Sequence, residues 1–326
     1  MNRDRKLLVA AGALLVLSII WGYNYVVMKK VMRYVDPFDF SAMRTFFGSL
    51  ALFAVLALRR RPLRPVALGG TLWLGLLQTA AFTALIQWAL VSGGAGKTAV
   101  LVYTMPFWLL MLARAFLGER MRGSQWMAVA LALGGLLLIL EPWTLRGDMQ
   151  STLLAVLAGL VWAASAVSAK RLRANVEVDL LSLTAWQMLL GSLVLCLIAW
   201  LLPSEAPQVT PYFIGALVYN ALFATGLAWL MWLFILDRLP AGLAGLSSLA
   251  VPVVGVLSGA MELGERPNAS ESWGMVCIVV ALLAISAIAM RGRNALAARA
   301  DGAREGAAPA AGATVGSSAV GREGGD

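Results

Sequence analysis

The sequence of 326 residues contains no histidine and only two cysteines, Cys196 and Cys277. Histidine is the usual general base near neutral pH and the commonest zinc ligand, so its absence argues against a metal centre and against most catalytic sites. Both cysteines lie inside apolar runs, where cysteine packs as a small apolar side chain more often than it forms a disulfide. We therefore expect no metal ion, no cofactor and no enzymatic activity.

Charged residues are also scarce, at 13% of the chain, whereas hydrophobic residues make up 60%. Soluble domains contain about 25% charged residues, so the solvent of this chain is largely lipid. The net charge of +9 comes from short basic runs between apolar segments rather than from one basic soluble face. This distribution argues against nucleic acid as a partner and favours a lipid bilayer.

Ten apolar segments follow one another along the chain. A helix needs about 20 residues to cross the hydrocarbon core, and most of the segments reach that length. Lipid offers the backbone no hydrogen-bond partners, so each segment is predicted to be a helix and the fold an all-α polytopic membrane protein. The predicted spans are residues 7–28, 40–58, 66–90, 96–116, 124–141, 152–171, 180–202, 211–235, 242–261 and 271–290.

Two stretches of the chain match each other closely enough to indicate an internal duplication. Pro106 precedes the tetrapeptide Leu-Gly-Glu-Arg at 117–120, and Pro252 precedes the same tetrapeptide at 263–266. The spacing between proline and tetrapeptide is the same in both copies. A matched proline and a matched charged tetrapeptide at one offset are harder to obtain by chance than matches among leucine, alanine and valine.

The duplication extends to other helices. The pattern Trp-x4-Val-x2-Lys runs from Trp21 to Lys29 in the first predicted helix and from Trp162 to Lys170 in the sixth. Each copy contains five crossings, an odd number, so the ten transmembrane helices are predicted to form a 5+5 inverted repeat. We divide the chain into a first repeat at 1–145, a second at 146–293, and a disordered cytoplasmic tail at 294–326, which is rich in Gly, Ala and Ser.

The basic residues of the short loops predict the orientation in the membrane. Most of them fall on the same side as the amino terminus when the crossings are counted along the chain. Lys and Arg accumulate in cytoplasmic loops, which places the amino terminus in the cytoplasm. An even number of crossings places the carboxyl terminus there as well.

These features together resemble the EamA-type drug/metabolite transporter superfamily. The resemblance rests on the inverted repeat of five-helix units, on Trp-x4-Val-x2-Lys closing the first helix of each unit, and on Leu-Gly-Glu-Arg closing the fourth; it covers about residues 7–290. Within the superfamily the chain is similar to bacterial amino-acid exporters of the YddG type. The resemblance implies a protein of the bacterial inner membrane that moves small metabolites outward, aromatic and other neutral amino acids among them.

Inverted repeats place the substrate site near the middle of the bilayer, between the halves, and polar side chains there usually face the bundle interior. Hydroxyl and amide groups can bond an amino acid's ammonium and carboxylate, and aromatic rings can form apolar walls. Packing alone is the alternative for each such residue. The predicted substrate-binding residues are Trp21, Asn24, Gln78, Phe82, Tyr103, Trp162, Ser165, Tyr219 and Ser248.

Proline and glycine in the duplicated motif predict how its helices bend and end. Pro106 and Pro252 lie at equivalent mid-membrane positions, where a proline frees a carbonyl group and bends the helix. We expect them to shape the cavity and to let the halves flex; a kink that serves packing only is the alternative. Gly118 and Gly264 are predicted to terminate their helices, with Glu and Arg in local ion pairs. A gating salt bridge is the sharper alternative.

The charges inside the spans bear on mechanism. No Asp or Glu lies securely in mid-membrane, which favours facilitated export over proton coupling. Arg44 lies several residues into its helix, with the polar Gln187 at the matched position of the second repeat, and its charge could attract a carboxylate.

Three classes of function stay open. The first is a small-metabolite carrier, an amino-acid exporter above all, which agrees best with the repeat. Among carriers, a multidrug exporter of lipophilic cations is the runner-up, supported by the aromatic content and opposed by the missing buried acid. The second class is an intramembrane enzyme and the third a membrane scaffold or sensor. An intramembrane enzyme lacks a base and a nucleophile at depth, and a membrane scaffold or sensor would more naturally carry a soluble domain. Because the duplication supplies both halves, a monomer is expected to suffice.

Overall fold

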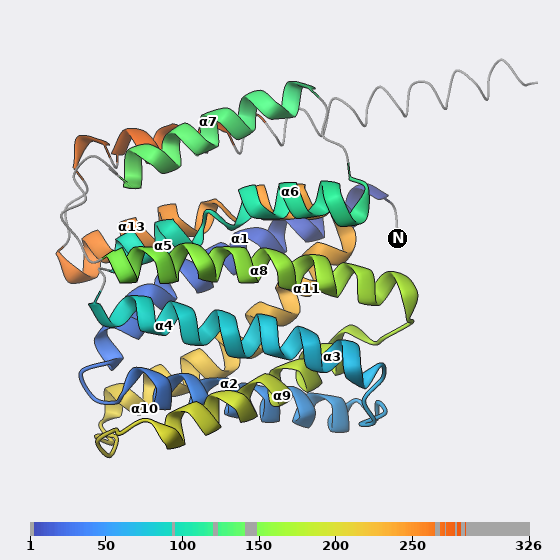
Figure 1. Ribbon diagram of the computed structural model, residues 1–326, viewed down its shortest axis with the longest axis vertical. Helices are drawn as coiled ribbons and strands as arrows, with labels where there is room; N and C mark the ends of the chain where they lie inside the picture. Colours follow the sequence, from blue (N-terminus) through green and yellow to red (C-terminus); the bar gives the residue numbers. More distant parts are fainter. Residues whose placement is uncertain are drawn as a thin grey trace, which may run out of the picture. The chain divides into compact units, whose positions relative to one another are not determined.

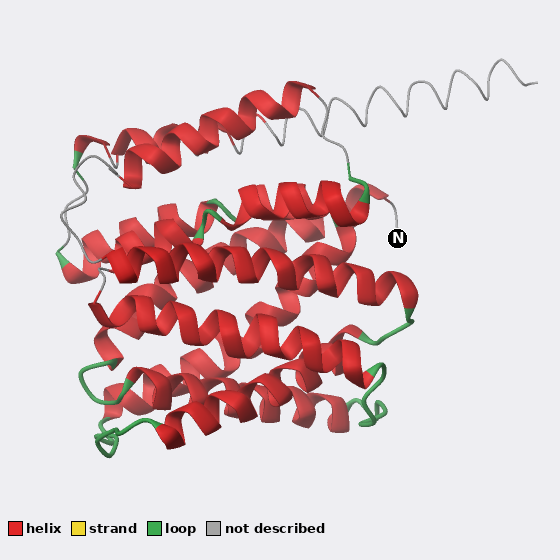
Figure 2. Cartoon of the chain, in the orientation of Figure 1, coloured by secondary structure: helices red, strands yellow, loops and turns green. Residues whose placement is uncertain are grey.

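The structure is a computed structural model, and it describes residues 3–92, 95–119, 123–140, 149–264, 268–270, 272–277, 279–281 and 284. The chain divides into two compact units, Met1–Leu283 and Ala284–Asp326, and the account that follows concerns the first. Every regular element in the described ranges is a helix, and Figure 2 draws no strand among them. The predicted all-α class is therefore confirmed for these residues.

The helices of the first part of the chain include one π-helical segment, η1, which continues directly into α4. They are α1 (Arg3–Val31), α2 (Pro37–Leu58), α3 (Leu68–Gly75), η1 (Leu76–Ala81), α4 (Phe82–Ser92), α5 (Ala95–Val102), α6 (Met105–Leu117) and α7 (Gly123–Leu140).

The second part repeats the same order of long, π-helical and broken helices. Its elements are α8 (Met149–Asn175), α9 (Leu180–Leu201), α10 (Pro211–Val218), η3 (Tyr219–Leu227), α11 (Ala228–Arg238), α12 (Ala241–Ser247) and α13 (Ala250–Leu263). Residues 272–277 are helical as well.

Within the described residues, six helices are long and apolar enough to cross a membrane. They cover Gly12–Val31, Pro37–Leu58, Leu68–Val91, Met149–Asn175, Leu180–Leu201 and Pro211–Arg238. Shorter apolar helices occupy Met105–Leu117, Val129–Leu138 and Ala250–Glu262. The structure is that of a polytopic membrane protein, while the count of ten crossings in two inverted sets of five stays a prediction.

The fourth and ninth predicted helices are each broken in the middle. A turn at residues 103–104 separates α5 from α6, and a turn at residues 248–249 separates α12 from α13. Pro106 and Pro252 follow these turns by two and three residues. A proline has no N–H to donate to the carbonyl four residues earlier, so the helix is weakest at that point. The single continuous helices predicted at these places are therefore wrong.

Aspartate residues at matched positions begin the second helix of each part. The Asp36 carboxylate accepts a hydrogen bond from the Phe38 N–H at 2.9 Å, and Asp179 accepts one from the Ser182 N–H at 3.0 Å. These caps satisfy donors that the first helical turn leaves open, and each is worth about 1 kcal/mol. Pro37 is the first residue of α2, and its ring fixes the φ angle at a value that suits the first helical turn.

Matched glycines let helices of the two parts cross in close contact. A Cβ atom at Gly48 of α2 would lie 2.8 Å from the carbonyl oxygen of Ala221 in η3. A Cβ atom at Gly191 of α9 would lie 2.5 Å from the carbonyl oxygen of Gly75, where α3 continues into η1. Both crossings thus require glycine, and both bring a π-helical segment against the second helix of the other part.

Helices from the two parts of the chain alternate in the bundle. In Figure 1, α2 lies beside α9 and α8 lies between α4 and α6, and the residue contacts agree. α1 packs on α13 and α6 packs on α8, while α2 contacts η3 and α9 contacts η1. α7 lies at the edge of this bundle against α5. The middle of the bundle is therefore lined from both parts of the chain.

Candidate functional site

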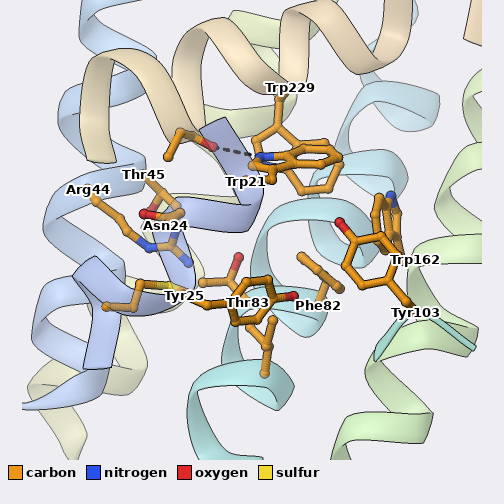
Figure 3. Close-up of a pocket in the computed structure, with 13 residues that line it drawn as sticks. Trp21, Asn24, Tyr25, Arg44, Thr45, Phe82, Thr83, Tyr103, Trp162 and Trp229 are labelled. Carbon is orange, nitrogen blue, oxygen red and sulfur yellow. Dashed lines mark hydrogen bonds between the residues drawn. The ribbon is translucent and has the colours of Figure 1, made fainter. Parts of the chain in front are cut away.

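A small cavity lies where α1, α2, α4, α8, η3 and α11 meet the break between α5 and α6. It has about 40 Å³ of space for the centre of a water molecule, which is room for a few waters at about 10–15 Å³ each. Figure 3 shows the side chains that surround it. They are Trp21, Asn24, Tyr25, Met28, Arg44, Thr45, Phe82, Thr83, Ile86, Tyr103, Trp162, Ala224 and Trp229.

Aromatic rings close one side of this cavity. Trp162 lies at the centre of the group, with ring centroids 5.4 Å from Trp21, 5.4 Å from Phe82 and 5.4 Å from Tyr103. Trp21 also meets Trp229 edge to face at 5.2 Å. Such contacts favour fixed ring orientations. We call these five residues the aromatic box, and it offers a broad apolar surface.

Two of the indole groups differ in how their N–H groups are used. The Trp21 Nε1–H donates to the carbonyl oxygen of Ala224 in η3 at 3.0 Å, drawn as the dashed line in Figure 3. That bond fixes the ring against a π-helical segment. The Trp162 Nε1 atom is buried and has no hydrogen-bond partner in the described part of the chain. A buried donor without a partner carries a desolvation cost.

The opposite side of the cavity is polar and carries the guanidinium group of Arg44. Figure 3 shows Arg44 and Thr45 from α2 beside Asn24 from α1, on the far side of the cavity from Trp162. Arg44 is only 7% exposed and Asn24 only 4%. Arg44 is also the only charged side chain among the described residues that line the cavity.

Arg44 has few partners within the described residues. Its Nη1 atom lies 3.5 Å from the Asn220 Oδ1 atom, at the limit for a hydrogen bond, and its Nε atom has no partner. The described residues make ion pairs elsewhere, but none of those pairs involves Arg44. The Asn24 Oδ1 atom is buried without a partner too. The polar side therefore presents a cationic donor and a neutral acceptor that the protein itself leaves unused.

The structure brings several of the predicted substrate-binding residues together. Trp21, Asn24, Phe82, Tyr103 and Trp162 all line the cavity, although they come from three helices and one helix break. The repeat-matched tryptophans are thus in contact across the two parts of the chain.

The other predicted binding residues lie outside the cavity lining; Gln78, Ser165 and Ser248 are buried, and Tyr219 is half-buried. The Ser165 hydroxyl donates to the Trp162 carbonyl at 2.7 Å and lies 3.5 Å from the Gln78 Oε1 atom. The Tyr219 hydroxyl donates to the Ile20 carbonyl at 2.8 Å. The Ser248 hydroxyl donates to the carbonyl oxygen of Gly245 in α12 at 2.7 Å. Their assignment to substrate binding stays a prediction.

Several lining residues are absent from the predicted set. Arg44, Thr45, Thr83 and Tyr25 contribute polar atoms, and Met28, Ile86, Ala224 and Trp229 contribute apolar surface. Arg44 carried a usable signal, because it is the single charge within residues 40–58. Trp229 is an aromatic residue that can form an apolar wall, whereas Met28, Ile86 and Ala224 carry no signal, since a lining aliphatic side chain and a packing one look alike in sequence.

One end of the bundle is held by Glu119, the acid of the first Leu-Gly-Glu-Arg motif. Its carboxylate accepts from the Lys170 ammonium at 2.9 Å and from the N–H groups of Ala241 and Gly242 at 3.0 and 3.3 Å. Burial alone would raise the pKa of Glu119, but these three donors together lower it below its ordinary value. These bonds are long-range, because Lys170 lies near the end of α8 and Ala241 begins α12. The expected local pair with Arg120 stays a prediction.

At the other end of the bundle, Lys30 in the last turn of α1 forms a second long-range ion pair, with Glu262 of α13. In both copies of the motif, glycine ends the helix in the left-handed conformation, with φ of 65° at Gly118 and 69° at Gly264. The predicted helix terminations are thereby confirmed. Arg120, Glu265 and Arg266 lie outside the described residues.

Comparison with known proteins gives matches along most of the chain. The EamA-like transporter family matches twice, at residues 8–141 and at residues 149–287. The inner membrane transporter YedA of Escherichia coli (strain K12) is 29% identical over 290 residues, covering 87% of this chain and 92% of YedA. A protein of the same organism named "Probable amino-acid metabolite efflux pump" is 27% identical over 292 residues, covering 86% of this chain and 96% of the pump.

A solved crystal structure has a similar fold. It aligns with a TM-score of 0.71 and 19% sequence identity, covering 89% of this chain and 99% of the other. At that identity the likeness concerns the fold alone.

Proposed function

The chain belongs to the EamA-like transporter family, and we propose that it exports neutral amino acids, aromatic ones among them, across a bacterial inner membrane. Family membership makes it a membrane transporter and not an enzyme. The substrate class follows the relative named for amino-acid metabolite efflux, and the inner-membrane location follows YedA. Both termini are assigned to the cytoplasm from the basic residues of the loops.

The observation that carries the proposal is the two-sided lining of the central cavity. The aromatic box fits an apolar or aromatic side chain, while Arg44 and Asn24 offer a cationic donor and a neutral acceptor on the other side. A free amino acid has the matching parts, with an apolar side chain at one end and a carboxylate and an ammonium group at the other. A few precisely placed polar groups in an apolar pocket are typical of small-molecule sites.

Alternating access between two inverted halves is the proposed mechanism. The pairing of α1 with α13 and of α6 with α8 supports it, because the two pairs exchange when the repeats are exchanged. The cavity is too small for phenylalanine in this conformation, and ion pairs join helices at both ends of the bundle. Loading and release therefore require one end to separate at a time. One chain supplies both halves, so we propose a functional monomer.

Export of lipophilic cations is the second candidate, and the aromatic box favours it. Indole rings attract cations through the negative face of the ring. Arg44 opposes this function, since a buried positive charge without a carboxylate among the described lining residues repels a second cation. The same lack of a lining acid argues for exchange that needs no proton gradient.

Counterflow in proteoliposomes tests the proposal. Vesicles that contain the purified protein are loaded with unlabelled neutral amino acids and given labelled phenylalanine, leucine, methionine or threonine outside. We expect accumulation that is absent from protein-free vesicles and is lowered by Trp162→Ala. Trp126→Ala on α7 is the matched control, because that ring is 52% exposed and lies away from the cavity.

One outcome of the counterflow experiment would refute the amino-acid proposal. If none of these amino acids exchanges while a lipophilic cation is transported under a pH gradient, the amino-acid proposal fails and the second candidate replaces it.

A further inference from the structure

Arg44 is buried at a place where its charge has no structural partner. A charged side chain within a membrane span costs several kcal/mol unless an opposite charge or several hydrogen bonds compensate it. In the described residues Arg44 has one long contact, to Asn220, and an Nε atom without a partner. Folding alone gives no reason to keep a guanidinium group there.

The matched position in the second repeat shows what packing alone needs. Gln187 lies on α9 against η1, as Arg44 lies on α2 against η3. The Gln187 Oε1 atom accepts a direct hydrogen bond from the Thr79 hydroxyl at 2.8 Å, although its Nε2 atom has no partner. A neutral amide therefore serves the same helix crossing, with a shorter bond. The crossing of α2 and η3 therefore does not need the positive charge of Arg44, and this charge lines the cavity.

The groups around Arg44 define what its charge can bind. The guanidinium group lies beside the Asn24 side chain, and both face the cavity across from the aromatic box (Figure 3). Guanidinium binds carboxylate through paired N–H donors, and an amide oxygen accepts from an ammonium group. No carboxylate of the described lining residues competes for Arg44.

We propose that Arg44 is the carboxylate receptor of the cavity, that Asn24 accepts from the substrate ammonium group, and that the transported species must therefore carry a free carboxylate. This inference rests on the proposed function, because it assigns the substrate class of the same cavity. Amino-acid amides and esters, which keep the apolar side chain and the ammonium group, are excluded as substrates. Carboxylates that lack the ammonium group bind more weakly than amino acids.

Ligand stabilisation of the wild-type protein tests the receptor without requiring transport. The thermal unfolding midpoint of purified protein is measured with phenylalanine, phenylalanine amide and 3-phenylpropionate. We expect apparent affinity to fall in the order phenylalanine, 3-phenylpropionate, phenylalanine amide, with the amide at least about tenfold weaker than phenylalanine, because it loses charge-assisted hydrogen bonds. Equal stabilisation by phenylalanine and its amide, or no stabilisation by any carboxylate, overturns the inference.

Substitutions then assign the effect to Arg44. Arg44→Gln, which installs the residue found at the matched position, is expected to lower phenylalanine affinity roughly 10- to 100-fold and to leave affinity for the amide almost unchanged. Arg44→Lys keeps the charge and should retain part of the preference, even though it loses bidentate geometry. If Arg44→Gln folds and still prefers phenylalanine to its amide, Arg44 is not the receptor.

Counterflow separates failure of this inference from failure of the proposed function. Exchange of phenylalanine by both wild type and Arg44→Gln, with equal apparent affinity, refutes the receptor and leaves an amino-acid exporter. Carboxylate-dependent stabilisation without any amino-acid exchange supports the receptor and refutes the exporter.

Discussion

The two ends of the helix bundle are joined by ion pairs of different construction. At one end, Glu119 accepts from Lys170 and from two N–H groups at the start of α12, so a single carboxylate holds three helices. Nearby, Arg173 of α8 pairs with Asp237 of α11 at 2.6 Å. At the other end, Lys30 of α1 pairs with Glu262 of α13.

The difference lies in how many partners are fixed and how far water reaches them. The side chains of Glu119 and Lys170 are 24% and 23% exposed, and those of Glu262 and Lys30 are 33% and 27% exposed. Backbone N–H groups at a helix start are already oriented, so they cost less entropy than a second flexible side chain. We infer that the Glu119 end is held closed more strongly in this conformation.

Removing the Glu119 charge should have the largest effect. With Cys196 and Cys277 replaced by serine, Ala169→Cys places a thiol beside Lys170 at a position that is 1% exposed. Glu119→Gln loses charge-assisted bonds worth about 1.5–3 kcal/mol, so a membrane-impermeant maleimide should label this thiol roughly 10- to 100-fold faster. The rate of labelling in sealed vesicles of known orientation is the measurement.

The control for this prediction lies at the same end. Glu177→Gln removes an exposed carboxylate between α8 and α9 and should leave the labelling rate unchanged. A Glu119→Gln rate equal to that of Glu177→Gln would show that Glu119 does not keep this end closed.

The pH dependence of stability should separate Glu119 from an ordinary exposed acid. Burial raises the pKa of Glu119 in the folded protein, but the donors Ala241, Lys170 and Gly242 together lower it by more, so the net shift is downward. A group with a lowered folded pKa stabilises the fold above its unfolded pKa, about 4.3 for Glu, and loses that contribution as pH falls through the folded value.

Wild type should therefore unfold at a higher temperature than Glu119→Gln by a constant few degrees from pH 8 to pH 5. The gap should narrow only below about pH 4. Thermal unfolding followed by circular dichroism is suitable, and a gap that already closes near pH 6 would mean that the Glu119 pKa is raised instead.

The positions of the helices could be predicted from the sequence, because an apolar segment of about 20 residues forms a helix when it crosses lipid. Both helix breaks were missed, although both prolines were identified. A proline predicts a weak point, while the turn of residues 103–104 also depends on α8, where a Cβ atom at Gly159 would lie 2.7 Å from the Val102 carbonyl oxygen. The spacing of apolar residues along one helix does not predict such a contact between two helices.

The candidate site was predictable in part, since five of the nine expected residues line the cavity. Trp21 and Trp162 were found because they match across the repeat. Gln78 and Tyr219 were expected in the lining, yet they lie within η1 and η3. A π-helical turn holds more residues than an α-helical turn, so a period of 3.6 residues does not give the direction of side chains within these segments.

Replacing the glycines that end α6 and α13 should cost about the same at both ends of the bundle. A Cβ atom at Gly118 or Gly264 would meet no other atom within 4 Å, so only the left-handed backbone is penalised, by roughly 1–2 kcal/mol. Gly118→Ala and Gly264→Ala should therefore lower the unfolding temperature equally.

The two glycine variants should differ in labelling, however. Gly118→Ala also displaces Glu119, so only this variant should speed labelling of the Ala169→Cys thiol. Unequal unfolding temperatures would indicate that one of the sites has lost packing as well as backbone freedom.

Removing the Glu262 charge should have the smallest effect. An ion pair at this level of exposure contributes about 0.2–1 kcal/mol, which corresponds to at most about a fivefold change in an opening equilibrium. The reporter is Val31→Cys, next to Lys30 and 0% exposed, in the same cysteine-free background. Glu262→Gln should speed its labelling by no more than that factor, and Glu205→Gln, an exposed acid in the loop after α9, should not change it. If Glu262→Gln instead matches the effect of Glu119→Gln at the other end, the two ends are equally strong, and the extra N–H donors at Glu119 add nothing to closure.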